Sequence, residues 1–270
     1  MTLESSTIGL IGAGNMASAM IEGFVRADPS RADRILATDR GSGKAARLAE
    51  ERGIVHVASN EELVDRSDIV LLCVKPIDVE RVLRSVGNRV TGTKALASVA
   101  AGVATVTMES ILDEDVPVFR LMPNVPVQVC SGTVCFAPGR FADTAAEERV
   151  LDWLRLLGTV VRLEERQFDA ATAVSGSGPA FIGLIVEAFE DAGIVAGLTH
   201  EKARQLILST MLGTATLLDE NDLSCSDLRR MVTSPGGTAA TGLASLERAG
   251  VRGAIIDGVL AAMRRAAELG

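Results

Sequence analysis

The sequence is poor in the residues on which several classes of protein depend. It contains no tyrosine, one tryptophan and 3% aromatic residues in all, so we expect no base-stacking platform for single-stranded nucleic acid. Its 27 basic residues are outnumbered by 35 acidic ones, which gives a net charge of −8. Nucleic-acid binding requires a basic face that neutralises phosphates. We therefore expect no nucleic-acid partner.

Metal-ligating residues are also scarce. The only histidines are His56, on a predicted strand, and His200, at the start of a predicted helix, and the four cysteines include no Cys-x-x-Cys pair. We therefore expect no metal site. Cys73 and Cys135 lie in apolar surroundings, which is typical of buried, reduced thiols in the cytoplasm.

Signals for export or membrane insertion are absent as well. The first residues lack a basic-then-apolar leader, and no apolar run approaches the roughly 20 residues that span a bilayer. We expect a cytoplasmic location and no membrane partner. Hydrophobic residues are plentiful, at 47% of the chain, and can form a substantial core in one large domain or two modest ones.

Short β-branched runs alternate with amphipathic segments up to residue 164. The strand-like runs are 8–13, 34–38, 68–74, 94–100, 116–122, 132–139 and 158–164, and the helical segments include 44–52, 60–67, 78–86 and 141–157. This alternation predicts an α/β Rossmann-type N-terminal domain, residues 1–164, with a mainly parallel sheet.

Strand-like runs stop after residue 164. The segments 170–193, 199–219, 226–232, 238–248 and 251–269 have helical patterns, which predicts an all-α C-terminal domain, residues 165–270. Its many small residues favour close helix packing in an intertwined oligomer. An ordinary monomeric helical core is the alternative.

The first strand runs into Gly12-Ala13-Gly14-Asn15-Met16-Ala17, a Gly-x-Gly-x-x-Ala motif. The first glycine permits a tight turn, the second lets the backbone approach a pyrophosphate, and the alanine lets the helix pack close to the strand. Main-chain N–H groups at the helix start attract phosphates. The motif predicts a dinucleotide site, although a glycine turn that merely packs a helix is the alternative.

The second strand ends at Asp39-Arg40. An acidic residue at this position can bind the ribose hydroxyls and favours NAD(H), whereas Arg40, with Ser42, can hold the 2′-phosphate of NADP(H). The nucleotide preference stays open, and a solvated Asp-Arg turn is a third interpretation. Further strand ends carry Val74-Lys75-Pro76 and Ser98 to Gly102, at the sheet edge where ligands bind. Small residues there leave room for a nicotinamide ring.

Residues that relay protons are missing. Nicotinamide enzymes that act on C–O bonds usually need a His, Lys or Tyr, but tyrosine is absent and the long helix after the sheet, SGSGPAFIGLIVEAFEDAG, contains no lysine. Reduction of a protonated C=N bond fits better, because the iminium already carries its proton and needs only a hydride.

Six motifs now occur in one order: GLIGAGNMA (9–17), CVKP (73–76), SVAAGV (98–103), RLMPNVP (120–126), AVSGSGPAF (173–181) and VTSPGGTAATGLASLE (232–247). Together they resemble the pyrroline-5-carboxylate reductase family over essentially the whole chain. The resemblance implies an NAD(P)H-dependent oxidoreductase that reduces the cyclic imine 1-pyrroline-5-carboxylate to L-proline in proline biosynthesis. It also implies a homodimer, and in this family dimers can associate into larger rings.

The resemblance assigns site residues by position. The cofactor contacts are Ile11, Gly12, Ala13, Gly14, Asn15, Met16, Asp39, Arg40, Asn60, Cys73, Val74, Lys75, Pro76, Val99, Ala100 and Ala101. The substrate contacts are Glu165, Met231, Ser234, Gly236, Gly237, Thr238 and Ala239, with Thr238 as the catalytic residue. Asp39 stands where the family often has a serine that holds the 2′-phosphate, a departure that favours NAD against the family habit of NADP.

The run Ser234-Pro-Gly-Gly-Thr238 suits an anionic substrate. Glycines let backbone N–H groups approach a carboxylate, the following helix adds its positive end, and proline limits the freedom of the unbound loop. A capped helix start without a ligand is the alternative. Ala239 departs from the family pattern, which commonly has a threonine whose hydroxyl contacts the imine nitrogen. We expect a slower enzyme, a reductase of another cyclic imine, or an NAD(P)-binding paralogue without catalysis.

Overall fold

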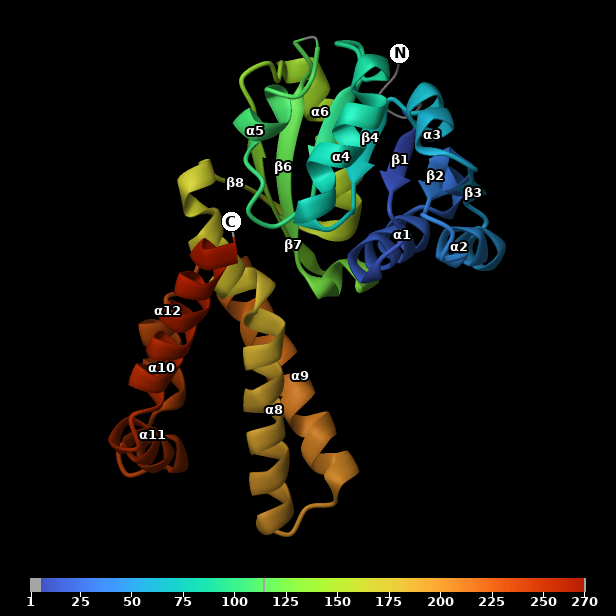
Figure 1. Cartoon of the computed structure of the whole chain (residues 1–270). Coiled ribbons are helices and arrows are strands. Elements are labelled where there is room, and N and C mark those ends of the chain that lie inside the picture. Colours follow the sequence, from blue (N-terminus) through green and yellow to red (C-terminus); the bar gives the residue numbers. More distant parts are fainter. Residues whose placement is uncertain (1–5, 114, 270) are drawn as a thin grey trace. The chain divides into compact units, whose positions relative to one another are not determined.

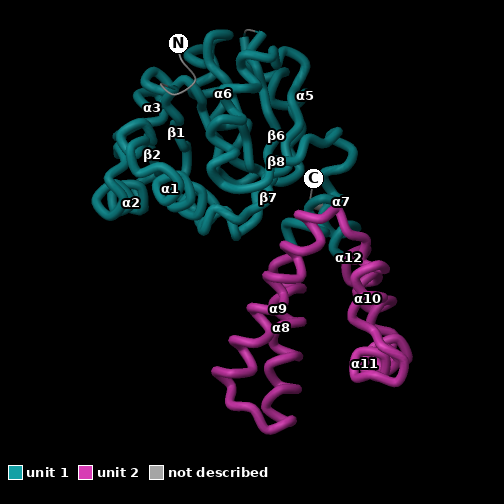
Figure 2. The backbone as a smooth tube through the Cα atoms, turned by 180° about the vertical axis from the view of Figure 1, so that it is seen from behind, with its two compact units in different colours: residues 1–177, 262–270 teal, residues 178–261 magenta. Residues whose placement is uncertain are grey.

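The computed structural model describes residues 6–113 and 115–269, and the chain divides into two compact units (Figure 2). The first unit comprises residues 1–177 and 262–270, and the second comprises residues 178–261. Residues 165–177, which the sequence pattern groups with the helical half, therefore belong to the unit that contains the sheet.

The first unit contains one eight-stranded sheet with the strand order β3-β2-β1-β4-β5-β6-β7-β8 (Figure 1). The strands are β1 (Ile8–Ile11), β2 (Ile35–Thr38), β3 (Val55–His56), β4 (Ile69–Leu72), β5 (Ala95–Ser98), β6 (Val118–Pro123), β7 (Gly132–Pro138) and β8 (Gly158–Arg162). All neighbours pair in parallel except β6 and β7, which are antiparallel. The expected mainly parallel sheet is confirmed, and so is the strand at His56.

Helices cover both faces of this sheet because its strands carry apolar side chains on both sides. In β4, Ile69 and Leu71 join one core and Val70 and Leu72 join the other. The first core includes residues of α1 (Asn15–Ala27), α2 (Lys44–Arg52) and α6 (Thr144–Leu154). The second includes residues of α3 (Asn60–Arg66), α4 (Pro76–Val86) and α5 (Thr105–Glu109).

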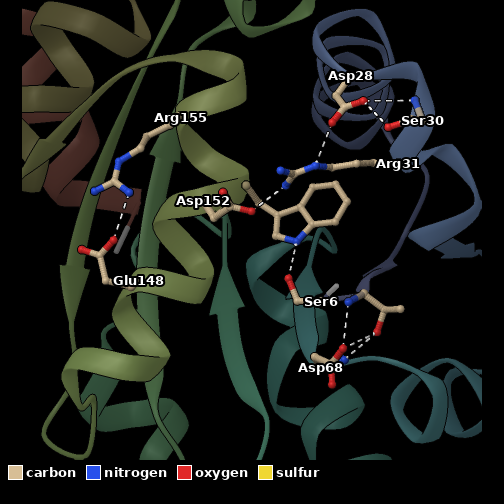
Figure 3. Close-up of polar contacts among 10 residues, drawn as sticks. Ser6, Asp28, Ser30, Arg31, Asp68, Glu148, Asp152 and Arg155 are labelled. Carbon is tan, nitrogen blue, oxygen red and sulfur yellow. Dashed lines mark hydrogen bonds and ion pairs between the residues drawn. The ribbon is translucent and has the colours of Figure 1, made fainter. Parts of the chain in front are cut away.

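Trp153 of α6 is the largest fully buried side chain of the first unit. Its ring meets Phe24 of α1 edge-on at a centroid distance of 5.2 Å, and its Nε1–H donates to the Ser6 hydroxyl at 3.0 Å. Arg31, in the 3₁₀ segment η2 (Pro29–Arg34), lies over the indole and pairs with Asp28 and Asp152 (Figure 3). The tryptophan thus ties α6 to α1 and to Ser6, two residues before β1.

Short 3₁₀ segments complete the sheet unit: η3 (Gly87–Arg89), η4 (Val125–Val129), η5 (Arg155–Leu157) and η6 (Glu165–Gln167). The helices that follow are α7 (Phe168–Ala171), the π-helical η7 (Thr172–Gly176), α8 (Gly178–Val195), α9 (His200–Glu220), α10 (Cys225–Val232), α11 (Thr238–Arg248) and α12 (Val251–Leu269). The expected helix 170–193 is therefore interrupted. In η7 the Ser177 N–H bonds the Thr172 carbonyl, five residues back, and Pro179 has no N–H with which to continue the ladder.

The second unit buries little of its own apolar surface. Of its described side chains, only Val186, Glu190 and Ala203 are buried, whereas Leu184 and Leu212 are 66% and 72% exposed. Large exposed apolar side chains on successive helices mark an interaction surface. The alternative of an ordinary monomeric core does not fit residues 178–261 as described.

The expectation that no segment is long and apolar enough to span a bilayer is wrong for one run. Among the described residues, the helical stretch Glu165–Val195 has a mean hydropathy of 1.3 over its most apolar window, of which 11% is buried. Length and composition alone are weak grounds for a membrane span, because a helix covered by another chain is apolar for the same reason.

Candidate functional site

The turn between β1 and α1 has the backbone that its glycines predict. Gly12 has φ +107°, and a Cβ there would lie 2.7 Å from the Cys73 carbonyl oxygen. A Cβ on Gly14 would meet no protein atom within 4 Å, and Gly14 caps α1 without a side-chain hydrogen bond. The space over Gly14 is therefore open, and the helix start keeps main-chain N–H groups free to face a pyrophosphate.

A pocket of about 390 Å³ opens beside this turn, where β1, β2 and β4 end. Its lining includes ten predicted cofactor contacts: Ile11, Gly12, Ala13, Gly14, Asp39, Arg40, Asn60, Cys73, Val74 and Lys75. Three further predicted contacts, Asn15, Met16 and Pro76, are the first residues of α1 and α4 and are outside this lining. The carboxyl ends of parallel strands converge on such a crevice, and these residues fit a dinucleotide.

Asp39 organises the loop between β2 and α2. Its Oδ1 accepts the Ser42 N–H at 2.8 Å, and its Oδ2 accepts the Ser42 hydroxyl at 2.9 Å and the Ala45 N–H at 2.7 Å. Burial raises the pKa of Asp39, but these hydrogen bonds outweigh it, so the net pKa lies below the usual value. The carboxylate is therefore ionised at neutral pH and already engaged by its own loop.

Arg40 is held by a residue that the sequence motifs do not include. Its Nη2 donates to Asp78 Oδ1 at 3.0 Å, and Arg81 donates to the same oxygen at 2.9 Å. Asp78 and Lys44 both line the pocket, but the sequence motifs predicted neither of them as a cofactor contact. The available signal for Asp78 was its place in the first turn of α4, directly after the strand end at Val74-Lys75.

Cys73 contributes a neutral side chain to the pocket. Burial raises the pKa of its thiol to about 12, so the group stays protonated at neutral pH. A thiol is a weak nucleophile compared with its thiolate. We therefore assign Cys73 no covalent role. The thiol is free, as expected, but the residue is partly exposed and not fully buried.

The predicted contacts Val99, Ala100 and Ala101 line a second, smaller hollow of about 90 Å³ within the same unit. Arg120 faces it, stacked 4.4 Å from the Phe168 ring centroid. Desolvation lowers the pKa of Arg120, while the nearby carboxylates of Glu165 and Asp169 act in the opposite direction.

Glu165, a predicted substrate contact, lies in η6. Its Oε1 accepts the Thr105 N–H at 2.9 Å at the start of α5, and it lies 3.9 Å from Arg120 Nη1. In the described structure this carboxylate holds together parts of the first unit.

The predicted substrate loop lies in the second unit. Gly237 N–H bonds the Ser234 carbonyl at 3.0 Å, and Gly236 between them has φ +71°. Pro at the second position and a positive-φ glycine at the third define a type II turn. Gly237 then caps α11 without a side-chain hydrogen bond, so N–H groups at Thr238 and Ala239 remain available to a carboxylate. Met231, at the end of α10, is 68% exposed.

Two family descriptions match successive parts of the chain. Residues 165–269 match "Pyrroline-5-carboxylate reductase dimerisation", and residues 7–102 match "NADP oxidoreductase coenzyme F420-dependent". The second match covers the glycine turn and the pocket lining, and the first covers the helical half with its exposed apolar surface.

Full-length relatives and solved structures extend the match to the whole chain. The pyrroline-5-carboxylate reductases of Methanosarcina acetivorans and Pseudomonas aeruginosa are 37% and 36% identical, each over 99% of this chain, and the alignments cover 99% and 98% of those proteins. The solved reductase of Coxiella burnetii superposes with a TM-score of 0.90 at 34% identity, over 98% of this chain and 99% of that one. The NADP-bound Plasmodium falciparum enzyme superposes with a TM-score of 0.86 at 27% identity, over 99% of both chains. The Rossmann-type sheet unit and the open space over Gly14 agree with these matches. The chain belongs to the pyrroline-5-carboxylate reductase family.

Proposed function

We propose that this chain is a pyrroline-5-carboxylate reductase that uses NAD(P)H to reduce the C=N bond of 1-pyrroline-5-carboxylate to L-proline. The observation that carries the proposal is the glycine turn, which is tight at Gly12 and leaves open space over Gly14, in a chain whose relatives match it over almost their whole length. It is an oxidoreductase of proline biosynthesis, and its substrate is a small molecule.

The first unit provides the nucleotide site. A bound NAD(P)H supplies the hydride. The main-chain N–H groups at the start of α1 bind the pyrophosphate, and the Asp39–Ala45 loop lies at the ribose end of the pocket. The remaining proposed nucleotide contacts are Ile11, Ala13, Asn15, Met16, Arg40, Asn60, Cys73, Val74, Lys75, Pro76, Val99, Ala100 and Ala101.

The second unit provides donors for the substrate carboxylate. The type II turn and the unsatisfied N–H groups at the start of α11 form a concave donor set with the positive end of the helix behind it. The proposed substrate contacts are Glu165, Met231, Ser234, Gly236, Gly237, Thr238 and Ala239. Thr238, exposed at the first position of α11, is the proposed catalytic side chain. An iminium substrate carries its own proton, so orientation of the reactants supplies most of the rate.

The test of this function is direct. Purified chain is incubated with 1-pyrroline-5-carboxylate and either NADH or NADPH, and both nucleotide oxidation and proline formation are measured. We expect proline in an amount equal to the nucleotide consumed. Absence of proline with both nucleotides would remove the proposal.

Ala239 supports a second candidate, a reductase of a different cyclic imine, because the missing hydroxyl leaves room at the substrate. A six-membered imine carboxylate and an imine without a carboxylate, compared with the five-membered substrate, distinguish the two. Faster turnover of either would favour this candidate. Tight nucleotide binding with no turnover of any imine would instead identify a paralogue without catalysis.

The role of the missing hydroxyl at position 239 can be tested by introducing a threonine there. We expect Ala239→Thr to raise kcat/KM for 1-pyrroline-5-carboxylate by about tenfold, because a hydrogen bond to a charged group contributes about 1.5 kcal/mol or more. Ala239→Val is the matched control, since it adds nearly the same volume without the hydroxyl. Equal rates for the two variants would show that the hydroxyl has no role.

The same family membership supports a proposal for the assembly and the location of the chain. The match to a dimerisation family indicates a homo-oligomer. We propose that a second copy covers the exposed apolar side chains of α8, α9 and α12, and that the resulting dimer can join larger rings. We propose residues 1–164 as the dinucleotide-binding domain, residues 165–270 as the dimerisation and substrate domain, and the cytoplasm as the location.

A further inference from the structure

The ribose end of the nucleotide pocket contains opposite charges in close contact. Arg40 and Lys44 are the cations on this side of the pocket, and Asp39 and Asp78 are the anions. Asp39 is engaged by the Ser42 and Ala45 donors of its own loop. Of the two cations, Arg40 is the one that pairs with a pocket carboxylate, that of Asp78, in the described structure.

Arginine beside the ribose is the usual partner for the 2′-phosphate of NADP(H), because its planar fork binds phosphate oxygens in pairs. The Arg40 guanidinium follows the β2 end and fits that role by position. However, its Nη2 already donates to Asp78 Oδ1 at 3.0 Å. NADPH would therefore have to compete with this carboxylate for the guanidinium, whereas NADH carries no 2′-phosphate and needs no such exchange.

We propose that Asp78 is a nucleotide-selectivity residue: by pairing with Arg40 it lowers the affinity for the 2′-phosphate and shifts the enzyme towards NADH. The proposal rests on the nucleotide site of the proposed function. The sequence motifs assign the choice between NADH and NADPH only to residues at the end of β2. The proposal adds Asp78 of α4, which lies 38 positions along the chain from Arg40.

The described contacts make the exchange feasible. The Arg40 side chain is 66% exposed and free to move, whereas that of Asp78 is 20% exposed. Asp78 Oδ1 also accepts from Arg81 at 2.9 Å, so the carboxylate keeps one cation when Arg40 leaves. Exposed ion pairs are weak, and Asp78 therefore biases the choice of nucleotide without blocking NADPH.

The experiment measures dissociation constants of NADH and NADPH for the full-length chain by calorimetric titration, with the ratio of the two as the readout. We expect Asp78→Asn to shift the ratio towards NADPH by about fivefold, the size of one exposed ion pair. The matched control is Glu80→Gln, which removes the same charge from the same helix. Glu80 pairs with Arg84 and is not in the pocket lining.

A double variant tests whether Asp78 affects nucleotide affinity through its pairing with Arg40. If Asp78 acts by holding this side chain, the shift disappears when Asp78→Asn is combined with Arg40→Gln. Equal ratios for Asp78→Asn and Glu80→Gln, or a shift that persists without Arg40, would overturn the proposal. These titrations need no turnover, so their outcome is independent of whether 1-pyrroline-5-carboxylate is the substrate.

Discussion

Gly14→Val greatly weakens nucleotide binding while leaving the fold intact: this is the expected result with the largest effect on function. Gly14 has extended backbone angles (φ −73°, ψ −176°) that valine adopts readily, and its Cβ position meets no protein atom within 4 Å. The valine side chain would instead fill the space that the pyrophosphate needs. Losing two charge-assisted hydrogen bonds of about 1.5 kcal/mol each weakens binding by about a hundredfold.

Gly12→Ala is the informative comparison for this variant. At Gly12 the backbone has φ +107° and a Cβ would lie 2.7 Å from the Cys73 carbonyl oxygen, so alanine strains the turn itself. We expect Gly12→Ala to lose both stability and nucleotide affinity, and Gly14→Val to lose affinity alone. Titration with NADPH measures the loss of nucleotide affinity, and the thermal midpoint of unfolding measures the loss of stability. An unchanged dissociation constant for Gly14→Val would mean that the nucleotide does not lie over Gly14.

Trp153→Ala has the largest expected effect on stability. The indole is 1% exposed, packs edge-on against Phe24 and bonds the buried Ser6 hydroxyl. Removing it deletes contacts with α1, with η2 and with Ser6 at once. We expect the free energy of unfolding to fall by about 3–5 kcal/mol. Trp153 is the only tryptophan, so urea unfolding must be followed by circular dichroism, at one fixed chain concentration because the chain is oligomeric.

Trp153→Phe separates packing from hydrogen bonding in the same experiment. Phenylalanine retains much of the apolar area beside Phe24 but leaves the Ser6 hydroxyl without its donor. We expect a loss of about 1–3 kcal/mol, the cost of an unsatisfied buried polar group. A Trp153→Ala variant as stable as the parent chain would contradict the assignment of this residue as a main packing contact between α6 and α1.

Several elements could be predicted from the sequence because neighbouring residues specify them. Helix α2 occupies the expected residues 44–52, since Gly43 and Gly53, both in the left-handed region, bound it on either side. The turn at Gly12 follows from its glycines, and α11 begins at the expected Thr238 after a Pro-Gly turn. The sequence predicted that the sheet is mainly parallel but not the order of its strands. The two-residue strand β3 is held chiefly by its neighbour β2.

The sequence by itself determined the glycine turns, the starts of α2 and α11 and the alternation that makes a Rossmann-type sheet, because these depend on backbone freedom and periodicity over a few residues. Only the tertiary structure decided that Arg40 meets Asp78, that Trp153 meets Ser6, and that Glu165 holds the start of α5. Those pairs are separated by 38, 147 and 60 residues. Which carboxylate reaches which donor depends on the order in which strands pack, and no local propensity encodes that order.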